Sequence, residues 1–207
     1  MRILGSRSSL LAVVTAGVFL IVEGVAGVVW PQSSGQAKDA SMNPKVVEEA
    51  GFNVIGIAER TTNAKEMSGE GEIGKQWGRF FQDNLLAQIP NKADTSIIAV
   101  ITDYATDKDG EYTHLIGARV TSTADMPAGM VVKKVPAGKY AIFTSEKGPV
   151  AQVVVGTWKR IWMQPKTAPG GDRAYKADYE VYDERARDPE NTQMDVHVGL
   201  SKRALVR

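Results

Sequence analysis

Two segments of the chain repeat one order of expected elements, and this repeat constrains the fold more than any other feature of the sequence. Each segment has the pattern of a strand, an amphipathic helix and a hairpin of two strands. The helix motif Trp77-Gly78-Arg79-Phe80 corresponds to Trp158-Lys159-Arg160-Ile161. The hairpins also match at two positions, Tyr104 with Tyr182 and Gly117 with Gly199. Two such units side by side would join their strands into one antiparallel sheet and place both helices on the same face.

The first unit begins with an expected strand over residues 52–60, where apolar residues alternate loosely. Residues 61–71 are polar and rich in glycine, which predicts a loop. A helix is expected over residues 72–89, because apolar residues recur there at steps of three and four and Pro90 follows. The hairpin strands are then expected over residues 95–104 and 112–120.

The second unit begins over residues 130–143 with a strand that Pro136-Ala137-Gly138 interrupts. Its helix is expected over residues 149–163, because Pro149 suits the first helical turn and Pro165 ends the run. Its hairpin strands are expected over residues 173–183 and 192–201. The predicted fold is therefore α+β: duplicated strand-helix-strand-strand units form one curved antiparallel sheet, with two helices on one side and a central cleft along the pseudo-twofold axis.

Residues 1–30 have the layout of a leader and not of the fold. Arg2 and Arg7 precede an apolar run over residues 10–22, and small residues follow, as in a secretory signal peptide. The alternative is an N-terminal membrane anchor, but Glu23 inside such a span would cost about 2.5–3.5 kcal/mol. Residues 31–50 are expected to be a linker, and residues 51–203 the folded domain. The protein is then periplasmic or secreted, or held at the inner membrane if the leader is retained.

The composition excludes several functions. A formal net charge of +1 provides no basic stripe for nucleic acid. The chain has no Cys and two His, so a cysteine zinc site and a histidine-rich metal site are excluded. We expect a monomer that uses no cofactor or metal, takes a small-molecule ligand, binds no nucleic acid, and contacts a membrane only through an uncleaved leader.

The strand expected over residues 173–183 carries the candidate site. Side chains alternate across a strand, so Asp178, Glu180 and Tyr182 share one face and Tyr179 and Val181 share the other. The apolar pair should meet the core. If the opposite face is open to water, Glu180 is an ordinary solvated residue. If that face lines a pocket, a carboxylate among aromatic rings suits an organic cation or serves as a general acid or base.

Five stretches of the chain, in this order and spacing, resemble the GyrI-like small-molecule-binding domain, also called the bacterial effector-binding domain. They are IGKQWGRFF, ITDYATDKDGEYTHLIGARV, VPAGKYAIF, TWKRIW and DYEVYD. The resemblance covers about residues 51–203 and implies the same duplicated fold. It also implies a central cleft that binds amphipathic, aromatic and often cationic compounds.

The resemblance places the acidic residue of this cleft at Glu180, in the D-[FY]-E-x-Y stretch. Its aromatic residues map onto Tyr104, Tyr112, Tyr140 and Tyr182. Many members carry a DNA-binding domain in front, where this chain has a leader and a linker. We therefore expect a stand-alone exported binding protein and not a complete transcription regulator.

Three other functions stay open. Some stand-alone members hydrolyse strained electrophilic rings in toxic natural products, and Glu180 would then orient or deprotonate a water while a tyrosine hydroxyl donates to the leaving oxygen. Haem binding would need His114 or His197 as the axial ligand. A structural or protein-interaction role would need neither site.

Overall fold

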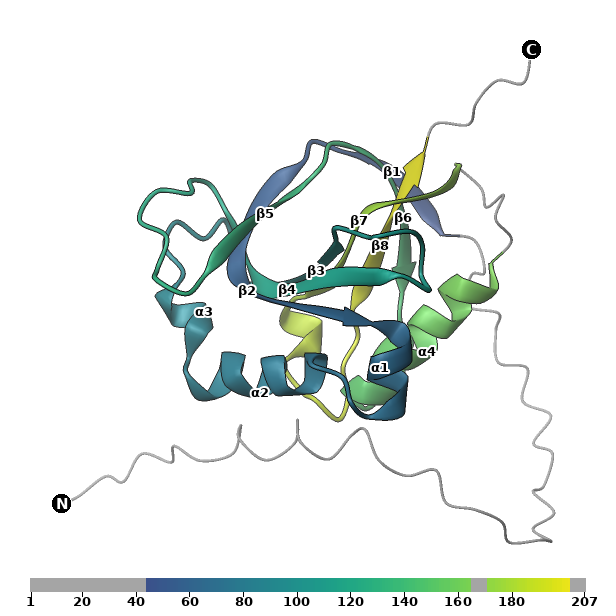
Figure 1. The fold of residues 1–207 in the computed structure, drawn as a ribbon, viewed down its shortest axis with the longest axis horizontal. Helices are drawn as coiled ribbons and strands as arrows, with labels where there is room; N and C mark the ends of the chain where they lie inside the picture. The colour runs from purple at the N-terminus through teal and green to yellow at the C-terminus, as the bar shows by residue number, and fades with distance from the viewer. Residues whose placement is uncertain (1–43, 165–170, 202–207) are drawn as a thin grey trace, which may run out of the picture.

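One antiparallel sheet of eight strands organises the fold, seen in a computed structural model that describes residues 44–164 and 171–201 (Figure 1). The strand order is β1-β6-β8-β7-β3-β4-β2-β5. The strands are β1 (Lys45–Glu49), β2 (Phe52–Thr62), β3 (Ile97–Thr102), β4 (Glu111–Val120), β5 (Val131–Val135), β6 (Gly138–Thr144), β7 (Asp172–Tyr182) and β8 (Asp195–Ser201). The helices are α1 (Asn63–Ser68), α2 (Ile73–Gln82), α3 (Leu85–Gln88) and α4 (Val150–Met163), with a short 3-10 turn η1 (Glu184–Ala186).

The strand order is the same from the centre of the sheet toward either edge. The first half runs β3, β4, β2 outward, and the second half runs β7, β8, β6. The central pair of β3 and β7 joins the two halves, with Ala99 opposite Glu180. This symmetry confirms the expected α+β fold of duplicated strand-helix-strand-strand units in one sheet.

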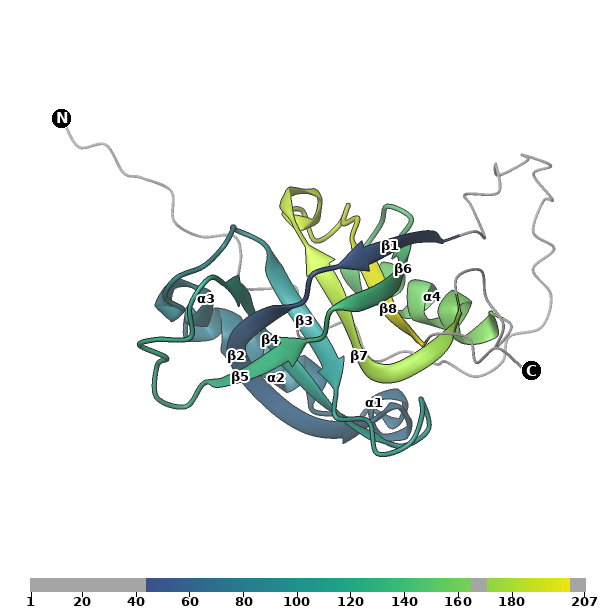
Figure 2. The same ribbon diagram turned by 90° about the horizontal axis from the view of Figure 1, so that it is seen from above.

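A short strand from each half completes the sheet of the other half. β1 precedes β2 in the chain but pairs with β6, and β5 precedes β6 but pairs with β2 (Figure 2). β1 lies inside residues 31–50, the range expected to be a linker. The sequence did not reveal it because the strand forms by pairing with β6, far along the chain.

The helices cover one face of the sheet, the lower face in Figure 1. Phe80 of α2 packs in a buried cluster with Ile57 and Ile116 of the first half. Ile161 of α4 packs in the corresponding cluster with Val196 of the second half. Trp77 and Trp158 both pack against these clusters, so the two matched tryptophans lie on the helix-covered face as expected.

The other face curves around a second core, beneath the edge strands β1 and β5 (Figure 1). Tyr179 of β7 is fully buried there, with Phe52 and Tyr140 in edge contact with its ring. Val181 packs against the same core. The apolar pair of β7 therefore meets the core, as the alternation predicts, and Glu180 points to the helix-covered face.

The matched glycines Gly117 and Gly199 serve the same purpose in the two halves. A Cβ atom at Gly117 would lie 1.9 Å from the Ile55 carbonyl oxygen, and one at Gly199 would lie 2.6 Å from the Ala177 carbonyl oxygen. A larger residue at either position would push neighbouring strands apart. The glycine match in the sequence thus reflects a close backbone approach in both hairpins.

Two predictions in the first half are wrong. The expected continuous helix over residues 72–89 is two helices, α2 and α3, because Asn84 takes a left-handed conformation with φ of 50°. Asparagine tolerates that conformation better than most residues do. The expected loop over residues 61–71 contains α1, which the Thr62 hydroxyl caps and Gly69, with φ of 83°, ends.

Candidate functional site

Glu180 is buried on the helix-covered face and is not a solvated strand residue. It is 4% exposed, and its two carboxylate oxygens each accept one hydrogen bond. The Trp158 indole Nε1 donates to Oε1 over 2.6 Å, and the Tyr182 hydroxyl donates to Oε2 over 2.7 Å. Burial raises the pKa of Glu180, and these two donors act in the opposite direction.

Both partners of Glu180 are neutral. Within residues 44–164 and 171–201, no Lys, Arg or His lies within 4.0 Å of its carboxylate. A buried carboxylate without a countercharge is costly, and a cation placed beside it offsets that cost. Burial raises the pKa of the Tyr182 hydroxyl, and the nearby Glu180 carboxylate raises it further.

Asp178, two residues earlier on the same face, has the opposite environment. It is fully buried, and the Arg173 guanidinium donates to its Oδ2 from Nη2 over 2.6 Å and from Nε over 3.2 Å. The Tyr104 hydroxyl donates to the same oxygen over 2.6 Å, and the Gly199 amide donates to Oδ1 over 2.8 Å. Asp178 is thus fully neutralised and hydrogen-bonded within the protein.

An irregularity in β7 creates the contact between Arg173 and Asp178. Arg173 pairs with Leu200 and Asp178 with Val198, so four residues of β7 stand against a single residue of β8. Tyr175, within this bulge, has a φ of 50°. The bulge folds Arg173 back over the strand, where its guanidinium reaches the Asp178 carboxylate.

Aromatic rings surround the two carboxylates. Tyr104 lies 5.9 Å from Tyr112 and 5.6 Å from Tyr175 between ring centroids, and Trp77 lies 5.2 Å from Tyr182. The Arg173 guanidinium carbon lies 4.5 Å from the Tyr175 ring, 5.4 Å from the Trp158 ring and 5.8 Å from the Tyr104 ring. We call this group the aromatic cluster: Trp77, Tyr104, Tyr112, Trp158, Tyr175 and Tyr182.

The structure brings four of the five predicted site residues together. They form two pairs on that face: Glu180 and Tyr182 share a hydrogen bond, and Tyr104 and Tyr112 stand in ring contact nearer Asp178, toward the other end of the β3–β7 pair. The pKa of Tyr112 is raised by burial first and then by the carboxylates of Glu66 and Glu180. The Tyr112 hydroxyl donates to the Asn63 side chain of α1 over 3.0 Å, so α1 closes this side of the cluster.

Tyr140 is the exception, because it lies on the opposite face of the sheet. Its ring lies 5.5 Å from Tyr179, and its hydroxyl donates to the Pro136 carbonyl over 2.9 Å. Burial raises its pKa to about 12. Tyr140 was expected at the site from the family resemblance alone, because alternation along residues 139–143 does not say which face of the sheet Tyr140 takes.

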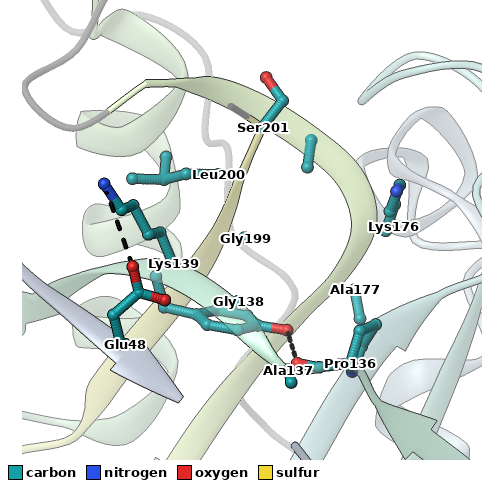
Figure 3. Close-up of a pocket in the computed structure, with 12 residues that line it drawn as sticks. Glu48, Pro136, Ala137, Gly138, Lys139, Lys176, Ala177, Gly199, Leu200 and Ser201 are labelled. Atoms are coloured by element: carbon teal, nitrogen blue, oxygen red, sulfur yellow. Dashed lines mark hydrogen bonds and ion pairs between the residues drawn. The ribbon is translucent and has the colours of Figure 1, made fainter. Parts of the chain in front are cut away.

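Tyr140 instead lines a separate cavity of about 440 Å³ between β1, β6, β8 and the bulge of β7 (Figure 3). Small residues such as Ala137, Ala177 and Gly199 form its walls. Glu48 and Lys139 face each other at one side, with 4.0 Å between the carboxylate and the ammonium (Figure 3). Ala174, Lys176 and Ala177 of the bulge also line this cavity.

Sequence reasoning missed three residues of the site: Trp158, Arg173 and Asp178. Trp158 lies at an apolar position of the helix expected over residues 149–163, but its indole carries an N–H that needs a partner when buried. Asp178 was placed on the correct face, but its partner Arg173 comes near only through the bulge. The signal available in the sequence was Arg173, a positive charge close to the Asp178-Tyr179-Glu180 stretch, which could have indicated an ion pair.

The two histidines have their polar and ring contacts with residues other than Asp178 and Glu180. His114 Nδ1 is 2.7 Å from the Gln76 side-chain oxygen, and burial lowers the pKa of His114 to about 4. His197 stacks on Tyr179 at 4.3 Å, on the opposite face of the sheet. In the part of the chain that the structure describes, no cluster of three or more His, Asp or Glu side chains is arranged for a metal ion.

The N-terminal residues 1–30, expected to be a leader or an anchor, lie outside the described residues. No helix among residues 44–164 and 171–201 is long and apolar enough to cross a membrane.

The duplicated sheet and a buried carboxylate among aromatic rings define a small-molecule-binding domain of the α+β class. The chain belongs to the Cass2 family of integron-associated effector-binding proteins, whose family model matches residues 45–200. This confirms the resemblance to the GyrI-like effector-binding domain.

Two curated proteins are similar in sequence. The chain is 32% identical to YobU of Bacillus subtilis over 148 residues, which cover 71% of this chain and 91% of YobU. It is 30% identical to the transcriptional regulator BrlR of Pseudomonas aeruginosa over 162 residues, or 77% of this chain. The match spans only 56% of BrlR.

Two solved structures share the fold. The integron cassette protein VCH_CASS2 from Vibrio cholerae is 29% identical, with a TM-score of 0.60 over 77% of this chain and 96% of that one. SAV2435 bound to tetraphenylphosphonium is 17% identical, with a TM-score of 0.63 over 77% of this chain and 94% of that one. At this identity, the second likeness concerns the fold alone.

Proposed function

We propose that the protein binds amphipathic, cationic aromatic compounds at the Glu180 carboxylate. One observation carries the proposal: Glu180 is buried among aromatic rings, and within the described ranges its only partners are two neutral donors. A ligand cation would supply the missing countercharge, and each ring face in good contact would add roughly 0.5–2 kcal/mol. Neutral ligands of the same shape would gain only the ring contacts.

Membership of an effector-binding family supports this proposal. SAV2435 shares the fold and was solved with tetraphenylphosphonium, a phosphonium cation that bears phenyl rings. That ligand belongs to SAV2435, and its relevance to this chain rests on the chemistry of Glu180 and the aromatic cluster described above.

Hydrolysis of a strained electrophilic ring is the second candidate. Burial raises the pKa of Glu180, and the Tyr182 hydroxyl lies 2.7 Å from its Oε2. A carboxylate with a raised pKa beside a hydroxyl can activate water and donate a proton to a leaving oxygen. Loss of an electrophilic substrate in the presence of wild-type protein, but not of Glu180→Gln, would support this reaction. Binding without consumption would leave the protein a binding module.

We also propose that the protein is exported, because residues 1–30 have the pattern of a signal peptide. Cleavage after Ala26 or Ala37 would release it into the periplasm or the medium. N-terminal sequencing of protein from the native host tests this. Full-length protein recovered in the membrane fraction would favour the anchor instead.

A pair of isosteric compounds tests the binding function. N-methyl-4-phenylpyridinium is a flat aromatic monocation, and 4-methylbiphenyl is its neutral counterpart with the same shape. We expect the monocation to bind about 10- to 100-fold more tightly in calorimetric or fluorescence titrations, the order of a close, desolvated charge pair. Equal affinity for the two compounds would refute the proposed function.

A further inference from the structure

Two buried carboxylates share the helix-covered face of β7 at alternate positions. Alternate residues on a strand are roughly 6.5–7 Å apart, so the carboxylates of Asp178 and Glu180 stand side by side. Trp158 connects them: its indole donates to Glu180, and the Arg173 guanidinium bound to Asp178 lies 5.4 Å from its ring. The face therefore holds two acceptors for positive charge, and the Trp158 ring reaches the surroundings of both.

Arg173 occupies the acceptor at Asp178 in the way a ligand cation would. Its guanidinium makes an ion pair of 2.6 Å with the carboxylate while it contacts the rings of Tyr104, Trp158 and Tyr175. The Arg173 side chain is 14% exposed and Asp178 is 0% exposed, so little water shares the contact. One carboxylate is neutralised from within the chain, and the other is left for a ligand.

We propose that Arg173 sets the charge of the ligand, so that the site selects aromatic monocations and rejects dications. This inference rests on the proposed function and adds a specificity-determining residue to it. With Arg173 in place, Glu180 accepts one positive charge, and a second charge on the ligand would meet the guanidinium. Without Arg173, a second cation could take its place over the rings and pair with Asp178.

The test adds a third member to the isosteric series. N,N′-dimethyl-4,4′-bipyridinium has the same two-ring frame as N-methyl-4-phenylpyridinium but carries two positive nitrogens, separated by about the spacing of alternate strand residues. The readout is the ratio of the dication and monocation dissociation constants for the full chain. We expect wild type to prefer the monocation, because the second positive charge of the dication would be repelled by the Arg173 guanidinium.

Arg173→Met removes the internal cation and keeps an apolar side chain of similar length. We expect it to shift the ratio toward the dication by about 10-fold or more, the effect of one gained charge pair. Adding Asp178→Asn removes the vacated carboxylate and should abolish that shift. Arg173→Lys keeps the charge and should retain the wild-type preference.

An unchanged ratio in Arg173→Met, or a shift that persists in the double variant, would overturn the proposal. If Arg173→Met does not fold, Asp178→Asn alone decides: it leaves the guanidinium unpaired beside Glu180 and should weaken the monocation relative to 4-methylbiphenyl by about 10-fold. No such weakening would overturn the proposal as well. Failure of wild type to distinguish the monocation from 4-methylbiphenyl would instead refute the proposed function itself.

Discussion

Trp158 of α4 donates its indole N–H to the Glu180 carboxylate of β7 over 2.6 Å, so a helix and the central strands are joined at a buried charge. The second donor, the Tyr182 hydroxyl, comes from β7 itself. Neither donor brings a positive charge. Both carboxylate oxygens are therefore hydrogen-bonded, yet the charge of Glu180 remains unbalanced by these partners.

Trp158→Phe should raise the pKa of Glu180 further, because the carboxylate loses one of the two hydrogen bonds that favour its charged form. The variant should also lose about 1–3 kcal/mol of stability at neutral pH. NMR titration of the glutamate carboxyl and urea unfolding measure the two effects. Trp162→Phe is the control, because it changes a neighbouring indole, 6.2 Å from Trp158 between ring centroids, and leaves the hydrogen bond from Trp158 to Glu180 in place. Matching titrations of the two variants would contradict the role of the indole.

Glu180→Gln should be more stable than wild type at neutral pH. Because burial raises the folded-state pKa of Glu180 above its unfolded value of 4.5, the folded state binds the extra proton. The stability linked to this proton is fully present below the unfolded pKa and is lost as the pH rises through the folded pKa. The advantage of Glu180→Gln should therefore shrink on acidification toward the ordinary glutamate range. Denaturant unfolding of both proteins across this pH range would show parallel curves if the account were wrong.

Gln76→Met should destabilise the first half of the sheet by about 1–3 kcal/mol. The Gln76 amide nitrogen donates to the carbonyls of Ile57 and His114 over 2.8 and 3.0 Å, and its side chain is buried. Because that nitrogen is a donor, the Gln76 oxygen accepts from His114 Nδ1, which fixes the tautomer. Exposed Gln82→Met, on the same helix, is the control for urea unfolding and should change little.

His114 should make the protein sensitive to acid. Burial lowers its folded-state pKa to about 4, below the ordinary value of 6.5. The neutral ring contributes stability above the unfolded pKa, and this contribution is lost as the pH falls toward 4. His114→Phe should reduce the loss of stability between pH 6.5 and 4 relative to wild type, as measured by chemical unfolding. The same pH slope in both proteins would exclude His114 as a source.

Val47→Asp should destabilise the domain by about 1–3 kcal/mol, because the charge would be forced against a core side chain. Val47 pairs with Tyr140 and packs on the core of the curved face, whereas neighbouring Val46 is exposed. Val46→Asp is the matched control. Equal melting temperatures of the two variants would mean that β1 adds nothing to the fold.

The sequence was sufficient to predict which face of a strand or helix a side chain occupies, because this depends on local periodicity. A period of two placed Tyr179 and Glu180 on opposite faces, and a period near 3.6 placed Trp77 and Trp158 over the sheet. The repeat then implied the symmetric sheet, since two matching units can share strands in few ways. The same alternation accounts for the contact of Glu180 with Tyr182, two residues along β7, whereas Tyr104 and Tyr112 meet each other nearer Asp178.

The remainder depends on contacts between residues far apart or on irregular backbone. β1 forms only because β6 offers a free edge, and Asn84 breaks a helix that its neighbours would have continued. Arg173 reaches Asp178 through a bulge that no periodicity predicts. Tyr140 packs against Tyr179, a residue far along the chain, and this contact places it on the face of the sheet opposite Glu180.

The most direct test of the account is the effect of Glu180→Gln on the affinity ratio of N-methyl-4-phenylpyridinium to 4-methylbiphenyl. Glutamine keeps the size of the side chain and an acceptor for the Trp158 indole, but it removes the charge. We predict that the preference of wild type for the monocation falls by about 10- to 100-fold in Glu180→Gln, which corresponds to roughly 1.4–2.8 kcal/mol. An undiminished preference in Glu180→Gln would contradict the claim that this buried carboxylate selects the ligand.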